Sequence, residues 1–128
     1  MLVVGLATAS AAAGLAGCAS GSGFAELDRP AEARDGLPSG LPAEAYDQLD
    51  AESARFVGND RGARLYLMKG AESGICLLVW PEDDRWFSGC GGDHFTVANP
   101  TRTYEVWADG ALPVKGATQL SPNVFATR

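Results

Sequence analysis

Short apolar segments alternate with turn-forming residues over residues 53–128, and this alternation restricts the fold more than any other feature of the chain. The turn segments are rich in Gly, Asn, Asp and Pro, which favour tight changes of chain direction. Several short strands at a spacing of roughly 8–12 residues are typical of antiparallel all-β domains. We therefore predict a mainly-β fold, as a small antiparallel meander or sandwich or a partly open barrel. The expected strands cover 55–57, 64–69, 75–80, 85–90, 95–97, 103–107 and part of 118–127.

The chain begins with an apolar stretch and has no charged side chain before Glu26. Residues 2–16 have about the length of a signal-peptide core and are short for the roughly 20 residues of a membrane-spanning helix. The stretch ends in Leu15-Ala16-Gly17-Cys18, which resembles the lipobox of bacterial lipoproteins. The resemblance implies that residues 1–17 are a signal peptide and that the thiol of Cys18 carries diacylglycerol. The acyl chains, such as palmitate, then anchor the mature protein at the extracytoplasmic face of the cell membrane.

Two other interpretations of this stretch stay open. A secretory signal cleaved after Ala19 gives a secreted protein, and an uncleaved apolar helix gives a helical anchor. Lipoprotein signals carry Lys or Arg near the start, whereas Leu2 follows Met1 directly here. We therefore expect the natural start codon to lie further upstream.

Residues 18–42 differ in composition from the strands that follow. They combine Gly, Ser and Pro with acidic side chains, and such a segment buries too little apolar surface to offset the entropy of ordering. We expect a lipidated N-terminus and flexible linker over 18–42. The β-domain then covers 43–128 and opens with one short helix or helical turn within 43–51, where good helix formers follow Pro42.

Cys76 and Cys90 remain once Cys18 is assigned to lipid. Both lie in predicted strands of an exported protein, and an oxidising compartment favours a disulfide between them. A hairpin centred on Asp83 places Cys76 opposite Cys90. In a non-hydrogen-bonded pair the Cα atoms lie about 4.5 Å apart, which is within the range that a disulfide accepts. The same register places Trp80 opposite Trp86 and predicts that the two rings stack on one face of the sheet.

Residue types that carry out catalysis are sparse in this chain. The only histidine, His94, follows Asp93, and neighbours on a strand point to opposite faces, so no Asp–His dyad is implied. One histidine without a free cysteine gives no zinc site, and the carboxylates at 82–84 lack the spacing of a calcium loop. The glycines at 89–92 lack the lysine and the helix of a phosphate loop, and favour a bulge or sharp turn. We expect no enzymatic activity, no metal and no cofactor; a hydrolase that uses His94 is a remote alternative.

Trp80, Trp86 and Trp107 form a candidate binding face, because tryptophans line many sugar-binding grooves. In so small a domain these side chains more often belong to the core. Their positions relative to solvent distinguish the two interpretations.

Motifs of the second half resemble a family of small proteins from high-GC Gram-positive bacteria. The resemblance covers about 53–128, and the motifs are Ser53-Ala54-Arg55-Phe56-Val57-Gly58, Leu65-Tyr66-Leu67, Gly74-Ile75-Cys76-Leu77-Leu78-Val79, Trp86-Phe87-Ser88-Gly89-Cys90-Gly91 and Leu120-Ser121-Pro122-Asn123-Val124. Members of the family are secreted or membrane-anchored and carry a β-domain with two cysteines. The resemblance supports the disulfide and implies no particular activity.

The expected function is that of a membrane-anchored, extracytoplasmic lipoprotein, a non-enzymatic binding or structural module of the cell envelope. Its partners are the membrane, through Cys18, and an envelope protein or the cell wall. The alternative is a small inhibitor or ligand-binding module that uses the tryptophan face. A net charge of −6 argues against a nucleic-acid partner, which requires a basic footprint.

Overall fold

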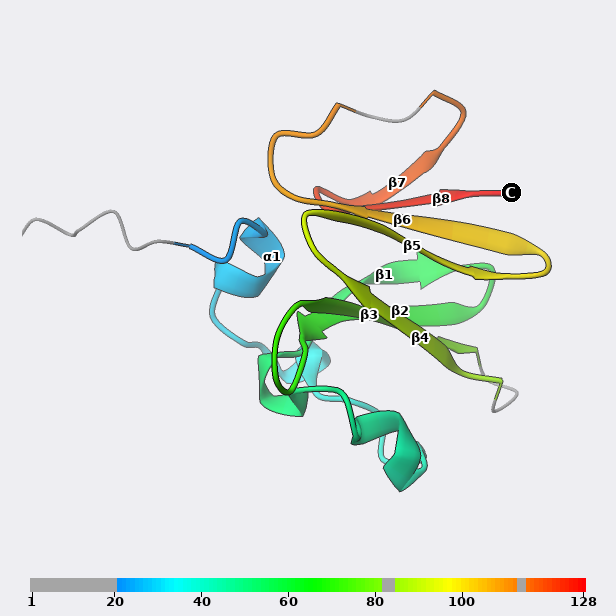
Figure 1. Ribbon diagram of the computed structural model, residues 1–128. Coiled ribbons are helices and arrows are strands. Elements are labelled where there is room, and N and C mark those ends of the chain that lie inside the picture. The colour runs from blue at the N-terminus through cyan, green and yellow to red at the C-terminus, as the bar shows by residue number, and fades with distance from the viewer. Residues whose placement is uncertain (1–20, 82–84, 113–114) are drawn as a thin grey trace, which may run out of the picture.

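The computed structural model describes residues 21–81, 85–112 and 115–128, which form two antiparallel sheets of four strands each (Figure 1). Cys18, the expected signal peptide over 1–17 and the expected hairpin turn at Asp83 lie outside the described residues. The first sheet has the order β1-β2-β3-β4, with β1 Arg55–Asp60, β2 Ala63–Lys69, β3 Ile75–Pro81 and β4 Phe87–Gly91. The second has the order β5-β6-β8-β7, with β5 His94–Asn99, β6 Arg102–Trp107, β7 Thr118–Ser121 and β8 Val124–Thr127.

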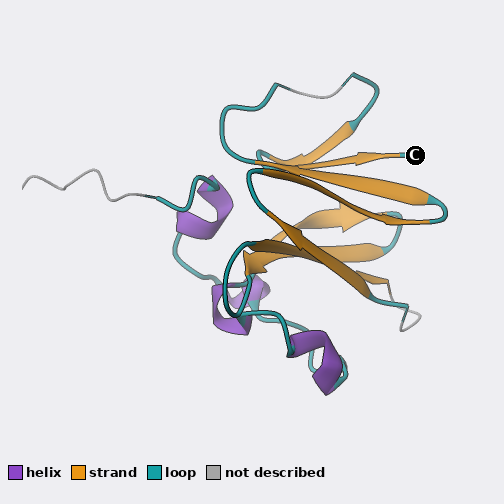
Figure 2. Ribbon diagram, in the orientation of Figure 1, coloured by secondary structure: helices purple, strands orange, loops and turns teal. Residues whose placement is uncertain are grey.

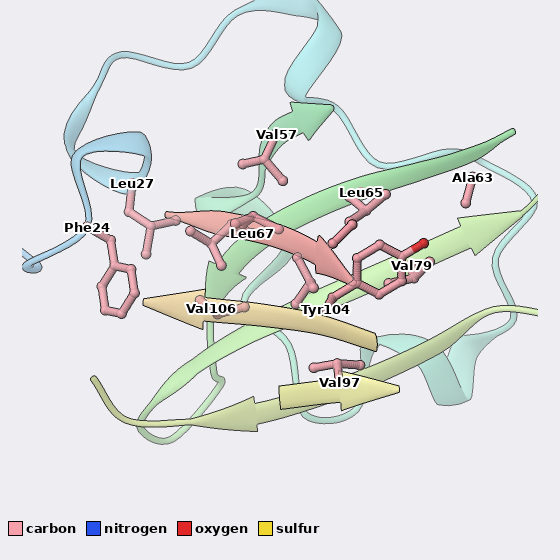
Figure 3. Close-up of a cluster of buried hydrophobic side chains, with 13 residues drawn as sticks. Phe24, Leu27, Val57, Ala63, Leu65, Leu67, Val79, Val97, Tyr104 and Val106 are labelled. Atoms are coloured by element: carbon pink, nitrogen blue, oxygen red, sulfur yellow. The ribbon is translucent and has the colours of Figure 1, made fainter. Parts of the chain in front are cut away.

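The predicted mainly-β class is confirmed, and the molecule is a two-sheet sandwich that is not closed into a barrel. The main core lies between the sheets, where alternate residues of each strand point inward (Figure 3). Leu65, Leu67 and Leu77 of the first sheet and Val106 and Val124 of the second are fully buried there. Where one last strand was expected within 118–127, the chain forms the hairpin β7–β8.

A second, smaller core lies on the outer face of the first sheet. Tyr66, Met68, Cys76 and Leu78 alternate with the inward-facing residues and are buried under helical turns. The strand over 75–80 is thus apolar on both faces because both faces are covered. The turns, drawn in purple in Figure 2, are α1 Ala25–Asp28, η1 Ala33–Asp35, η2 Ala43–Tyr46 and η3 Ala51–Ser53. The expected helical turn within 43–51 is present as η2.

The structure differs from the flexible linker expected over 18–42. From Ser22 onward the chain packs on the sandwich, and Phe24 and Leu27 are buried in the main core. Hydrogen bonds hold it there: Gly23 accepts from the Asp109 N–H at 2.8 Å, and the Ala25 N–H donates to the Asp109 carboxylate at 2.8 Å. Phe24 and Leu27 are three residues apart and therefore lie on the same side of the helical turn. Through these two side chains α1 covers the sheets, although the neighbouring residues in the sequence are polar.

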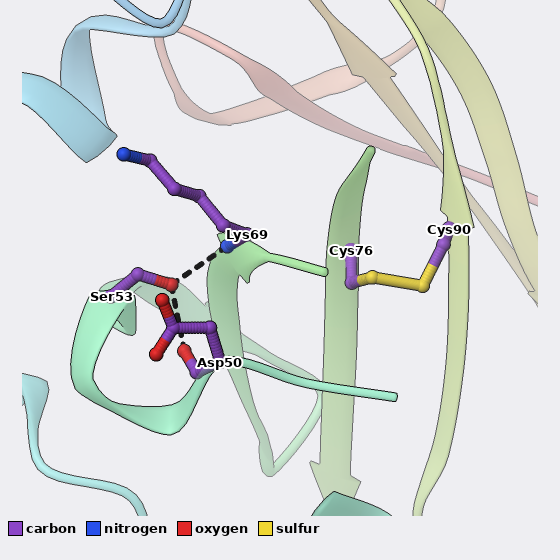
Figure 4. Close-up of a disulfide and its surroundings, with 5 residues drawn as sticks. All are labelled: Asp50, Ser53, Lys69, Cys76 and Cys90. Atoms are coloured by element: carbon purple, nitrogen blue, oxygen red, sulfur yellow. Dashed lines mark hydrogen bonds between the residues drawn. A yellow bond between two sulfur atoms is a disulfide. The ribbon is translucent and has the colours of Figure 1, made fainter. Parts of the chain in front are cut away.

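Cys76 and Cys90 form the predicted disulfide between β3 and β4 (Figure 4). They are paired residues of the two strands, as the expected register requires, and the pairing continues to Val79 and Phe87. Cys76 is fully buried and Cys90 is exposed. In the chain-entropy model a closed loop of this length contributes about 3 kcal/mol to stability.

The chain changes sheet between β4 and β5, through the segment expected to form a bulge or sharp turn. The two strands approach closely here, and the glycines make room. A Cβ at Gly91 would lie 2.5 Å from the Cβ of Phe95, and a Cβ at Gly89 would lie 2.9 Å from Val97 Cγ2. The glycines therefore serve the crossing from one sheet to the other.

Among the residues that the structure describes, no helix has both the length and the apolar character needed to span a membrane.

Candidate functional site

The three tryptophans do not share a face. Trp80 and Trp86 both pack against the second core on the outer side of the first sheet, as the predicted register requires. Trp107 lies on the other sheet and follows the inward-facing Val106, so it points away from the main core. All three are half-buried. A single binding face made of all three is therefore not formed.

A surface hollow on the outer face of the first sheet is the best candidate for a binding site. Its lining consists of Arg34, Phe56, Asn59, Arg64 and Tyr66, and we call it the arginine–aromatic hollow. The rings of Phe56 and Tyr66 meet edge to face with centroids 5.7 Å apart. The Arg34 guanidinium lies 6.0 Å from the centroid of Phe56, so a cation borders the aromatic floor.

Arg64 borders the hollow from β2 and connects it to the tryptophans. Its guanidinium lies 5.9 Å from the ring of Trp80. Arg64 is exposed and has no carboxylate partner among the residues in the described ranges. Arg34, in contrast, pairs with the exposed Glu32 at 2.9 Å. An exposed ion pair contributes little to stability, so loss of the Glu32 contact would cost Arg34 little.

A buried carboxylate holds Arg34 over Phe56. Asp35 accepts two hydrogen bonds of 2.7 Å from the Arg29 guanidinium and one each from the Glu32 and Phe56 N–H groups. The hydrogen bonds from Arg29 lower the pKa of Asp35 well below its usual range and outweigh burial, which raises it. Asp35 is therefore ionised at neutral pH and fixes η1, with Arg34 beside it, to β1.

The hollow continues along β1 into a second depression between the edges of the two sheets. Arg34 and Phe56 line both depressions, and Leu120, Ser121 and Pro122 close the far side of the second, where Glu26 of α1 adds a carboxylate. β1 and β7 are the edge strands that meet here.

His94 lies on the outer face of the second sheet and not in the hollow. Its ring stacks on Trp107 with centroids 3.5 Å apart, and its Nε2 lies 3.5 Å from the Glu105 carboxylate. The adjacent Asp93 is not its partner, in agreement with the strand geometry. The groups in contact with His94 are thus the Glu105 carboxylate and the Trp107 indole.

Acidic and cysteine side chains do not converge on a metal site in the described ranges, where no group of three or more His, Cys, Asp or Glu is placed to hold an ion. A further hollow beside Cys90 has Asp47 and Glu72 in its lining, together with Gln48 and Ser73.

The arginine–aromatic hollow is suited to ligand recognition. Its guanidinium groups can bind an anionic group, and its aromatic rings can pack against an apolar or planar one.

Sequence reasoning identified Trp80 near this hollow but missed Arg34, Phe56, Arg64 and Tyr66. The alternation of Arg64 and Tyr66 along β2 places both on one face, which was a detectable signal. Arg34 lies in the segment expected to be a linker, and no local pattern indicates that it folds back onto β1.

No family model, curated protein or solved structure matches this chain.

Proposed function

We propose that the chain is an exported, lipid-anchored and non-enzymatic binding module of the cell envelope. The observation that carries the proposal is the Cys76–Cys90 disulfide, since such a bond forms and persists in oxidising, extracytoplasmic compartments. In this proposal Cys18 supplies the membrane anchor and the sandwich is the binding domain. Its partner is an envelope protein or the cell wall.

Lipidation of Cys18 is tested by feeding cells an alkyne analogue of palmitate and detecting the labelled protein. We expect the wild-type chain to be labelled and to fractionate with the membrane, and Cys18→Ala to lose both properties. Ser20→Ala is the matched control, because it changes a neighbour and keeps the acceptor thiol. A labelled band that persists in Cys18→Ala contradicts the proposal, and so does a wild-type chain that carries no label.

The arginine–aromatic hollow favours a more specific second candidate, a module that binds an anionic ligand. Arg64 offers a cation without a carboxylate partner in the described structure, and Phe56 and Tyr66 supply the adjacent apolar surface. A carboxylate-bearing chain gains charge-assisted hydrogen bonds from the guanidinium groups. Trp80, under Arg64, reports on occupancy of the hollow.

Titration with a short oligo-glutamate peptide tests this candidate. We expect the indole N–H resonance of Trp80 to shift on binding, and Arg64→Ala to weaken the affinity about tenfold, equivalent to about 1.4 kcal/mol. Arg61→Asn is the matched control: it removes the same charge from the β1–β2 turn, and Asn tolerates the left-handed backbone there, where φ is 49°. Equal losses in the two variants indicate non-specific attraction. No shift in the wild type rejects the candidate.

A further inference from the structure

We infer that the sandwich lies against the lipid surface, with Leu112 of the β6–β7 connection inserted among the headgroups beside the lipid anchor. The inference rests on the proposed lipidation of Cys18. It adds an orientation and a second contact with the bilayer, made by the fold itself.

The tether between Cys18 and the folded domain is short. Ser22 already belongs to the folded domain: its N–H donates to the Asp28 carboxylate at 2.9 Å, and its hydroxyl donates to the Phe24 carbonyl at 3.0 Å. Phe24 itself is 2% exposed. Only three residues, 19–21, therefore separate Cys18 from the domain. A chain of that length spans at most about 14 Å from Cys18 to Ser22, even when fully extended.

This short tether holds one end of the domain near the bilayer. The headgroup layer is only roughly 5–8 Å deep on each side of the hydrocarbon core. A tether of about 14 Å cannot hold the domain well clear of that layer. The end of the sandwich that carries Ser22 and α1 is consequently the end that meets the lipid (Figure 1).

The β6–β7 connection, with Leu112, starts at that end of the sandwich. Asp109, at the start of the β6–β7 connection, is bonded to the N-terminal segment through the Gly23 carbonyl and the Ala25 N–H. Leu112 follows three residues later, so its Cα lies no more than about 11 Å from that of Asp109. Its side chain is 85% exposed, and it is the one exposed large hydrophobic side chain in the described parts of the chain. Lys115 follows and supplies a cation for anionic headgroups.

The acidic groups at this end are held by hydrogen bonds or an ion pair, but the donors to Asp28 and Asp109 are neutral and leave both charges in place, so the contact is expected to depend on the apolar side chain. The Asp109 carboxylate accepts from Ala25 and from the Asn123 amide at 2.9 Å, and Asp28 accepts from Ser22. Glu26 pairs with Arg29 at 3.0 Å. Leu112, the one large hydrophobic side chain that is exposed in the described ranges, thus lies where a lipid anchor brings it to the membrane. An apolar side chain beside an acyl anchor is a second membrane signal, and acyl anchors are commonly reinforced by one.

The test uses the full lipidated chain in vesicles of zwitterionic and anionic phospholipid. A bimane fluorophore is attached to Leu112→Cys, or to Thr101→Cys in the β5–β6 turn at the opposite end of β6. Thr101 is exposed, so both variants fold as the wild type does. Cys76 and Cys90 are in the disulfide and the Cys18 thiol is acylated, so the new cysteine is the one that reacts. We expect phospholipids brominated on the acyl chains to quench bimane at position 112 and leave position 101 unchanged.

The outcomes separate this inference from the proposed function. A chain that carries palmitate label and floats with the vesicles, but shows equal quenching at positions 112 and 101, overturns the inference and leaves lipidation intact. A chain without label overturns the proposed function, and the inference with it. Bimane stands in for the leucine at position 112, so quenching there in vesicles of purely zwitterionic lipid supports apolar insertion at this position. Quenching that requires anionic lipid assigns the contact to Lys115 and overturns the role of Leu112.

Discussion

Replacing Phe24 with alanine is expected to lower the free energy of unfolding by about 3–5 kcal/mol. Phe24 is among the largest fully buried side chains, with 2% of its surface exposed, and it packs with Leu27 into the core between the sheets. The cavity left by the ring is bordered by both α1 and the strands, and rigid strands do not collapse into it. A loss of this size is a large fraction of the stability of a small domain.

Urea unfolding followed by tryptophan fluorescence measures the effect as a shift of the transition midpoint. The matched control is Leu112→Ala, also a truncation of an apolar side chain, which is expected to change stability by no more than about 0.5 kcal/mol because Leu112 is 85% exposed. A Phe24→Ala variant with wild-type stability would mean that residues 21–42 are a tether in solution, as their composition alone suggests.

The strands were accessible to sequence reasoning because their signals are local. Each is a run of apolar residues between turn residues, and the disulfide register follows from the symmetric spacing of Cys76 and Cys90 about the turn. The path of residues 21–42 was not accessible. The groups that hold its start, Asp109 and Asn123, lie more than 80 residues away along the chain. Phe56, which binds Asp35, lies 21 residues away, and a composition argument does not detect partners at such distances.

In the candidate site, too, the features with local sequence signals were predictable and those set by distant contacts were not. Trp80 and Trp86 share a face because strand pairing, a local property, places them there. Trp107 was grouped with them on residue type alone, and the sheet assignment of its strand separates it. Arg34 enters the hollow only because Asp35 binds the N–H of Phe56, a contact between residues 21 positions apart. Side chains that are positioned by tertiary hydrogen bonds are therefore the part of a site that cannot be predicted from a single sequence.

Removing the carboxylate of Asp60 is expected to have a comparably large effect, about 3–5 kcal/mol for Asp60→Ala. Asp60, on β1, accepts two hydrogen bonds of 2.8 Å from the Arg102 guanidinium and one of 2.8 Å from the Tyr104 hydroxyl, both on β6. The side chains of Asp60 and Arg102 are 8% and 12% exposed. Alanine would leave the arginine charge nearly buried without a partner, at the point where the two sheets are joined by polar contacts.

A comparison with an exposed ion pair tests whether burial causes the large loss of stability expected for Asp60→Ala. Arg34 and Glu32 also form an ion pair, at 2.9 Å, but their side chains are 58% and 59% exposed. Glu32→Ala is therefore expected to cost no more than about 1 kcal/mol in the same urea experiment. Equal losses for Asp60→Ala and Glu32→Ala would show that the Asp60 pair is solvated in solution. A double-mutant cycle with Tyr104→Phe then assigns the share of the hydroxyl.

The same carboxylate gives stability a defined dependence on pH. Burial raises the pKa of Asp60, but the hydrogen bonds from Arg102 and Tyr104 outweigh it, so the pKa lies below its ordinary value. The unfolded chain consequently takes up a proton before the folded chain does, and stability falls as the pH drops below about 4. Asp35, whose pKa is lowered mainly by Arg29, acts in the same direction.

Asp60→Asn cannot titrate at this position, so the free energy of unfolding of the variant should fall less steeply than that of the wild type between about pH 4 and pH 2. Parallel pH profiles for the two proteins would exclude Asp60 as the source of the acid sensitivity.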